Sequence, residues 1–133
     1  MILDNLLVLM DTTLTASAAT TSHIDQVAAN QAIGNEMYLE CLVTTTLDST
    51  EEDATLTLAL QGDTVTGFGS VVTLVSSAAI AEASLAAGYV LRVRVPVLAD
   101  GYQFLRGYLT VGTHNFTSGA VKVYFTQTPF IAQ

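Results

Sequence analysis

The sequence predicts an all-β fold, an antiparallel β-sandwich or jelly roll of about eight strands. Three observations lead to this prediction. Apolar and polar residues alternate in one segment after another, which is the pattern of half-buried strands. Glycine-containing turn sequences separate these segments, and no long helical pattern lies between them. At 133 residues the chain is long enough to bury a core, so residues 1–133 are expected to form a single domain.

The predicted strands follow one another along the chain. They are expected near residues 6–10 and 13–16 and at residues 37–45, 54–60, 70–77, 89–98, 104–112 and 120–127. In most of them leucine and valine occupy one face, and charged or hydroxyl-bearing side chains occupy the other. A slip of one residue in the segment 89–98 would bury Arg92 and Arg94, so the pairing register of that strand is well specified.

Three segments need separate interpretation. Residues 70–77 are apolar at both parities, which predicts a strand covered on both faces. Pro96 has no N–H to donate, so the strand 89–98 is expected to lie at a sheet edge or to carry a bulge. Residues 76–88 combine a serine cap, alanines and a final glycine, and both a short helix and an extended loop fit this pattern.

Charge and hydropathy exclude several classes of partner. Only 12% of the residues are charged and the net charge is -8, with four basic residues in the whole chain. Nucleic-acid binding depends on neutralising phosphates, so DNA and RNA are not expected as partners. The longest uncharged run, residues 64–81, is too rich in Ser, Thr and Gly for a bilayer core, and the amino terminus lacks the basic region of a signal peptide. With so little charge, the surface is expected to be covered by Thr, Ser and Gly or by contact with other subunits.

No pattern of catalytic, cofactor-binding or metal-ligating residues stands out. Four carboxylates cluster between two predicted strands, at Asp48, Glu51, Glu52 and Asp53. Their spacing is not that of a calcium loop, so we interpret the segment as a hydrated loop, with a weak cation site between subunits as the alternative. His23 and His114 lie far apart, and Cys41 falls on a core-facing position. The chain is therefore expected not to be an enzyme and to need no cofactor or metal.

A small set of basic and aromatic residues forms the candidate interface, since Arg and Tyr are favoured at protein contacts. The candidates are Arg92, Arg94, Phe104, Arg106, Tyr108, Phe130 and Ile131. The two arginines of 89–98 share one outward face, and Arg106 shares its face with Phe104 and Tyr108. The last two candidates lie beyond the final strand and are expected to pack against this subunit or another. Ordinary cross-strand pairing of the arginines with carboxylates is the alternative.

Three stretches of the chain resemble the small jelly-roll capsid cement, or decoration, proteins of tailed bacteriophages. They read MILDNLLVLMDTTLTASAATTSHIDQV at 1–27, ASLAAGYVLRVRVP at 83–96 and FLRGYLTVGTHNFTSGAVKVYF at 104–125. The likeness runs nearly end to end and is least at residues 47–77. The resemblance implies a homotrimer on the outer surface of the virion capsid, over threefold and quasi-threefold axes. There it would clamp neighbouring copies of the major capsid protein.

A second function class competes with this one. A jelly-roll carbohydrate-binding module would stack sugars on exposed aromatic residues such as Tyr102, Phe104 and Tyr108. The absence of tryptophan weighs against it. A cupin-like enzyme would need clustered histidines, and the chain has only two.

Overall fold

The structure is a computed structural model, which describes residues 8–20, 24–25, 38–65, 67–94, 102 and 104–126, with residues 24 and 25 described by their backbone alone. These residues contain ten β-strands and one turn of 3-10 helix at Glu82–Ser84. No described helical segment is long and apolar enough to cross a lipid bilayer. The predicted all-β fold is confirmed.

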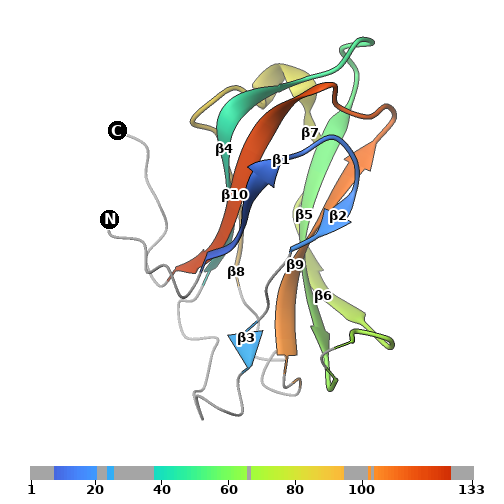
Figure 1. Cartoon of the computed structure of the whole chain (residues 1–133), viewed down its shortest axis with the longest axis vertical. Helices are drawn as coiled ribbons and strands as arrows, with labels where there is room; N and C mark the ends of the chain where they lie inside the picture. Colours follow the sequence, from blue (N-terminus) through green and yellow to red (C-terminus); the bar gives the residue numbers. More distant parts are fainter. Residues whose placement is uncertain are drawn as a thin grey trace.

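The strands form two antiparallel sheets that lie face to face (Figure 1). The four-stranded sheet consists, in spatial order, of β1 (Val8–Thr13), β10 (Ser118–Thr126), β4 (Tyr38–Asp48) and β8 (Val90–Arg94). The six-stranded sheet consists of β2 (Ala18–Ala19), β9 (Phe104–Gly112), β5 (Thr55–Asp63) and β6 (Val72–Ser76), with β3 (Ile24–Asp25) beside β9 and β7 (Ile80–Ala81) beside β5.

The pairing of these strands is that of a jelly roll. We count β2 and β3 together as one interrupted strand, and β6 and β7 together as another. The first strand of the chain, β1, then pairs with the last strand, β10. Moving inward, β2 and β3 pair with β9, β4 pairs with β8, and β5 pairs with β6. This nested antiparallel pairing rolls one long hairpin into two packed sheets, which is the double Greek-key arrangement.

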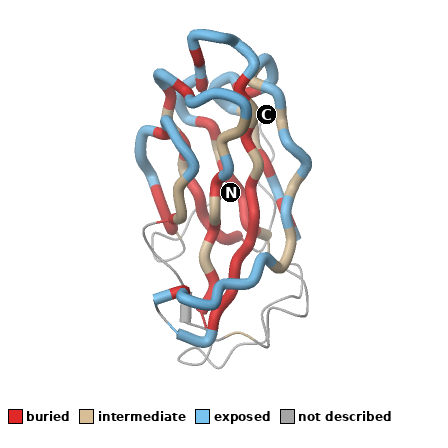
Figure 2. The backbone as a smooth tube through the Cα atoms, turned by 90° about the vertical axis from the view of Figure 1, so that its right-hand side faces the viewer, coloured by how far each residue is buried: buried red, intermediate tan, exposed pale blue. Residues whose placement is uncertain are grey.

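The hydrophobic core lies between the two sheets, where the buried residues follow the strands (Figure 2). The alternation predicted for the strands places their inward residues here, and Cys41 and Leu58 are among those with no exposed surface. Gly107 of β9 also faces inward, because a side chain there would approach Thr20, Val123 and Leu39 within 3.0 to 3.5 Å. Glycine at this position therefore lets the two sheets pack closely.

The prediction for the short second strand is wrong in position. The chain turns at residues 14–17, where the Leu14 N–H donates to the Gly119 carbonyl and Leu14 is buried, and β2 begins at Ala18. The alternation of polar and apolar residues at 13–16 therefore does not indicate a hydrogen-bonded strand. At these residues the chain crosses from one sheet to the other. The short strands β3 and β7 had no clear sequence pattern.

The prediction that residues 70–77 form a strand covered on both faces is also wrong. β6 is the last strand on its side of the six-stranded sheet, and Val71 and Val72 are 36% and 41% exposed. Apolar residues at both parities do not reveal whether a strand lies at the centre or the edge of a sheet.

The structure also shows the conformation of residues 76–88 and the place of the strand that precedes Pro96. Residues 76–88 contain the short strand β7, the single 3-10 turn and a further turn at residues 87–88, so no α-helix forms there. β8 lies at an edge of its sheet, as Pro96 predicted, although Pro96 itself is outside the described residues.

Candidate functional site

The candidate interface residues are divided between the two outer faces of the sandwich. Arg92 and Arg94 lie on β8, whose intervening residue Val93 is in the core, so both arginines project from the four-stranded sheet. The three candidates on β9 project from the six-stranded sheet, because Leu105 and Leu109 are core residues. Because outer faces of a sandwich point in opposite directions, these two sets do not form one continuous surface. Phe130 and Ile131 lie outside the described residues.

A polar row crosses the outer face of the four-stranded sheet. Tyr124 of β10 lies opposite Glu40 of β4, which lies opposite Arg92 of β8. The Tyr124 hydroxyl donates to Glu40 Oε1 at 2.9 Å, and Arg92 Nε donates to Glu40 Oε2 at 2.7 Å. Arg92 therefore forms a cross-strand ion pair with a carboxylate, which was the alternative to an interface role for this residue.

Two members of this row are buried, which alternation alone did not predict. Glu40 and Tyr124 are both 0% exposed, although both project from the outer face of the sheet. Burial, followed by the hydrogen bond to Glu40, raises the pKa of Tyr124. A buried carboxylate is tolerated here because each of its oxygens accepts a hydrogen bond.

The outer face of the six-stranded sheet carries a stacked arginine. Arg106 Nε donates to Gln61 Oε1 at 2.9 Å across the β5–β9 pair, and the guanidinium lies 4.3 Å from the centroid of the Phe68 ring. This is the distance of a cation–π contact. Phe104 is only 8% exposed and Tyr108 is half-buried. Arg106 is thus engaged within the chain.

The loop that brings Phe68 over the sheet is held by Asp63, a residue that the sequence analysis did not single out. This β5–β6 loop spans residues 64–71, of which residue 66 is not described. The Asp63 carboxylate accepts hydrogen bonds from the backbone N–H groups of Thr64, Val65 and Ser70 at 2.6, 3.4 and 2.8 Å. Burial acts to raise the pKa of Asp63, but these hydrogen bonds outweigh it and lower the pKa. An aspartate at the end of a strand, followed by glycines, was the available signal.

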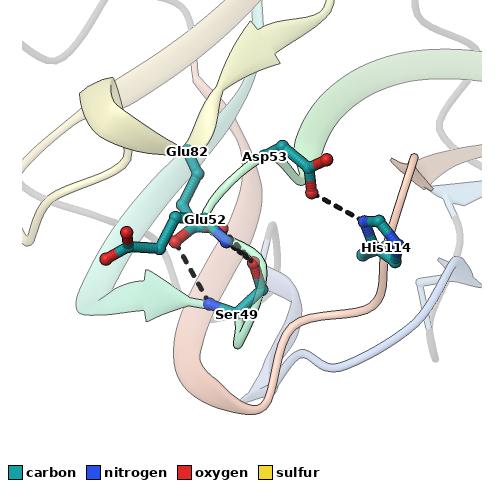
Figure 3. Close-up of polar contacts among 5 residues, drawn as sticks. All are labelled: Ser49, Glu52, Asp53, Glu82 and His114. Atoms are coloured by element: carbon teal, nitrogen blue, oxygen red, sulfur yellow. Dashed lines mark hydrogen bonds and ion pairs between the residues drawn. The ribbon is translucent and has the colours of Figure 1, made fainter.

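The acidic segment between β4 and β5 lies at the other end of the sandwich, and Figure 3 shows how it is organised. Ser49 donates to the Glu82 carboxylate through its hydroxyl and through its backbone N–H, the latter at 3.2 Å. The Glu52 N–H donates to the Ser49 hydroxyl at 3.1 Å. The hydroxyl hydrogen bond is the main cause that lowers the pKa of Glu82. A buried serine thus ties the loop to the segment after β7.

A second contact joins the acidic segment to the β9–β10 turn. Asp53 Oδ1 lies 2.6 Å from His114 Nδ1, and both side chains are about half exposed, at 50% and 44%. The hydrogen bond to Asp53 raises the pKa of His114, and the charges of Asp53 and Glu51 act in the same direction. His114 lies in a surface turn and pairs with a carboxylate there.

The described residues offer no arrangement that is typical of a metal or nucleophile site. Among them, no group of three or more His, Cys, Asp and Glu side chains could hold a metal ion. Cys41 is buried, and this burial raises the pKa of its thiol to about 12. The thiolate required of a nucleophile is therefore strongly disfavoured at neutral pH.

The fold and these surfaces define a β-sandwich protein of the jelly-roll class. Within that class the chain belongs to the Bbp16 family, a phage-associated family whose model matches residues 10–125. A search of curated proteins finds no match. The association with phages implied by the resemblance is thereby confirmed at the level of the family.

Proposed function

We propose that this protein is a structural virion protein that binds the outer surface of a phage capsid as a homotrimer. It would lie over threefold and quasi-threefold axes and cement neighbouring copies of the major capsid protein. The observation that carries the proposal is the match of residues 10–125, which include nearly all of the described jelly roll, to a phage-associated family. The jelly roll is also a fold that viral capsid proteins use.

The physical basis of cementing is selective binding. A protein that binds the assembled shell but not its free subunits stabilises the shell by mass action. A trimer that engages several positions of the lattice at once gains effective concentration, so each single contact can be modest. A rigid sandwich suits this role because little conformational entropy is lost when it binds.

The carbohydrate-binding alternative loses support from the placement of its aromatic residues. Phe104 is 8% exposed, Tyr102 packs against the hydrophobic core, and Tyr108 is half-buried. Sugar stacking requires a flat and accessible ring face. These three residues do not provide such a platform.

Two measurements test the proposal. Light scattering of the purified protein is expected to give three times the 14.0 kDa chain mass, about 42 kDa. Capsids that lack the protein are expected to bind it when it is added back and then to withstand higher temperature and dilution. Unassembled major capsid protein, as the matched control, is expected not to bind. A stable monomer at micromolar concentration would contradict the trimer, and capsids equally stable with and without the protein would contradict cementing.

A further inference from the structure

The acidic segment and the β9–β10 turn meet at one end of the sandwich (Figure 3). The acidic segment spans residues 49–54, between β4 and β5, and the turn spans residues 113–117. Asp53 Oδ1 lies 2.6 Å from His114 Nδ1, so one carboxylate and one imidazole bridge the two loops. Both side chains are about half exposed, so solvent protons reach this contact freely.

Other hydrogen bonds hold the margins of the two loops. The Glu82 carboxylate accepts the Ser49 N–H at the start of the acidic segment. The Asp48 carbonyl accepts the Thr117 N–H at 2.7 Å at the end of the turn. Among the described residues, the contact of Asp53 is the side-chain link between the exposed parts of the two loops.

The residue before each partner of this contact has a strained backbone. Glu52 precedes Asp53 and has a φ of 60°, and Thr113 precedes His114 and has a φ of 68°. Positive φ is uncommon for residues other than glycine, and for a β-branched residue such as threonine it is an outlier. Strained residues persist where surrounding contacts hold them, and they are frequent at switch regions. A contact between these two loops therefore acts on two conformations that are unfavourable by themselves.

His114 is also the basic side chain that balances the charge of this end. The acidic segment has three carboxylates within residues 51–53. The four Lys and Arg residues lie on β8, β9 and β10, and the nearest of them in register is Lys122. It lies four residues along β10 from Ser118, the partner of Asp48. This is about 13 Å, which exceeds a Debye length of about 8 Å.

The charged groups that face the imidazole of His114 come from the acidic segment. Asp53 contacts it, and Glu51 acts on it through charge. The crossing at residues 14–17 and the first residues of β5 also adjoin the turn, and they have no titratable side chain. The other carboxylates of this end lie on the side of Ser49, away from the imidazole (Figure 3). They are Asp48, Glu52 and Glu82.

We propose that the contact between Asp53 and His114 is a pH-sensitive latch for this end of the molecule. When His114 is protonated, the ion pair holds the acidic segment against the β9–β10 turn and keeps both strained residues in place. A neutral imidazole still donates one hydrogen bond to Asp53, but the attraction between opposite charges is lost. The two loops then open more often while the sheets stay folded. This inference concerns the free protein and does not depend on the proposed function.

The direction of the switch follows from the same contact. The hydrogen bond to Asp53 is the main cause that raises the pKa of His114. The latch is therefore closed below the ordinary pKa of histidine and opens as the pH rises through the raised value.

Amide hydrogen exchange, measured by NMR, tests the latch. The Glu52 N–H donates a hydrogen bond within the acidic segment, and the His114 N–H donates to the Gly112 carbonyl, so their exchange reports the opening of the two loops. Protection is the exchange rate in an unstructured peptide of the same sequence divided by the rate in the protein. Between about pH 5.5 and about pH 8.5 we expect protection at both amides to fall about threefold.

The Ser70 amide is the internal control. It donates to the Asp63 carboxylate in the β5–β6 loop, at the other end of β5. The pKa of Asp63 is lowered, so this carboxylate stays ionised at both pH values. Protection at Ser70 is expected to be equal at the two pH values.

Two variants of one residue separate charge from shape. His114→Gln is neutral at every pH, and His114→Arg is charged at every pH. Position 114 is exposed in a turn, so both variants are expected to fold. The Glu52 amide is read in each, because it lies in the other loop. We expect low protection at both pH values with glutamine and high protection at both with arginine.

Three results would overturn the latch. One is equal protection at the two pH values in the unmodified protein. Another is a fall with rising pH that is as large in His114→Gln as in the unmodified protein, because the histidine charge would then not control opening. The third is a parallel fall at Ser70, which would show that the whole molecule loosens.

Discussion

The carboxylate of Glu40 has no exposed surface, although it projects from the outer face of its sheet. It depends on its hydrogen bonds, which include those from Tyr124 and Arg92. Removing a donor from a buried carboxylate leaves one oxygen less well satisfied, which costs more than the net value of an ordinary hydrogen bond. Tyr124 is therefore expected to matter for stability through its hydroxyl as well as its ring.

Replacement of Tyr124 by phenylalanine tests this dependence. Tyr124→Phe is expected to lower the free energy of unfolding by about 1 to 3 kcal/mol, because the Glu40 carboxylate loses a buried donor. Urea denaturation at neutral pH measures the change. Tyr38→Phe is the matched control, since Tyr38 lies on the same side of β4 and its hydroxyl has no hydrogen bond among the described residues. Equal losses for the two variants would show that the hydroxyl of Tyr124 has no special role.

At the level of loops and strands, the acidic segment shows why its four carboxylates were difficult to interpret from sequence. Their spacing correctly argued against a calcium loop. The partners that organise the segment, Glu82 and His114, lie 33 and 61 residues away from Ser49 and Asp53. No local pattern indicates such contacts, because they depend on which loops meet at one end of the sandwich.

The contact between Asp53 and His114 makes the stability of this end depend on pH. The pKa of His114 is raised in the folded protein, chiefly by the hydrogen bond to Asp53. A group with a raised folded pKa stabilises the fold below its unfolded pKa, and that stability is lost as the pH rises through the folded pKa. Asp53→Asn is therefore expected to lower the melting temperature at about pH 5.5 and to change it little at about pH 8.5.

Glu51→Gln is the control for this prediction. Glu51 raises the pKa of His114 through charge alone, so its replacement should have a smaller effect at the lower pH. Calorimetry at both pH values measures the melting temperatures, and an NMR titration of His114 follows its protonation. Equal losses for Asp53→Asn at the two pH values would contradict a role for the histidine charge.

Strand positions were largely predictable, and strand environments were not. The alternation at residues 37–45 and 54–60 correctly identified β4 and β5 and their core-facing residues. The prediction from side-chain pattern was wrong for β6. Its apolar residues predicted a strand covered on both faces, although β6 lies at the edge of the described sheet. The alternation of side chains is a property of the strand itself, whereas the burial of each face depends on the neighbouring elements that the fold supplies.

For the molecule as a whole, the two sheets share one core that draws residues from nearly every strand. Neither sheet can bury its inner face without the other. The protein is therefore expected to unfold in a single cooperative transition, with far-ultraviolet and near-ultraviolet circular dichroism changing together on heating. Two separate transitions would contradict the prediction of one domain over residues 1–133.

The sequence by itself determined that the chain forms β-strands, which side of strands such as β4 and β5 faces the core, and that Cys41 belongs inside. These properties follow from side-chain period and composition, which act within a few residues. The tertiary structure alone decided that Val8 lies opposite Tyr124, that Glu40 is buried, and that β6 is the last of the described strands on its side of the sheet. Those outcomes depend on pairings between residues far apart in the chain, and no short stretch of sequence contains them.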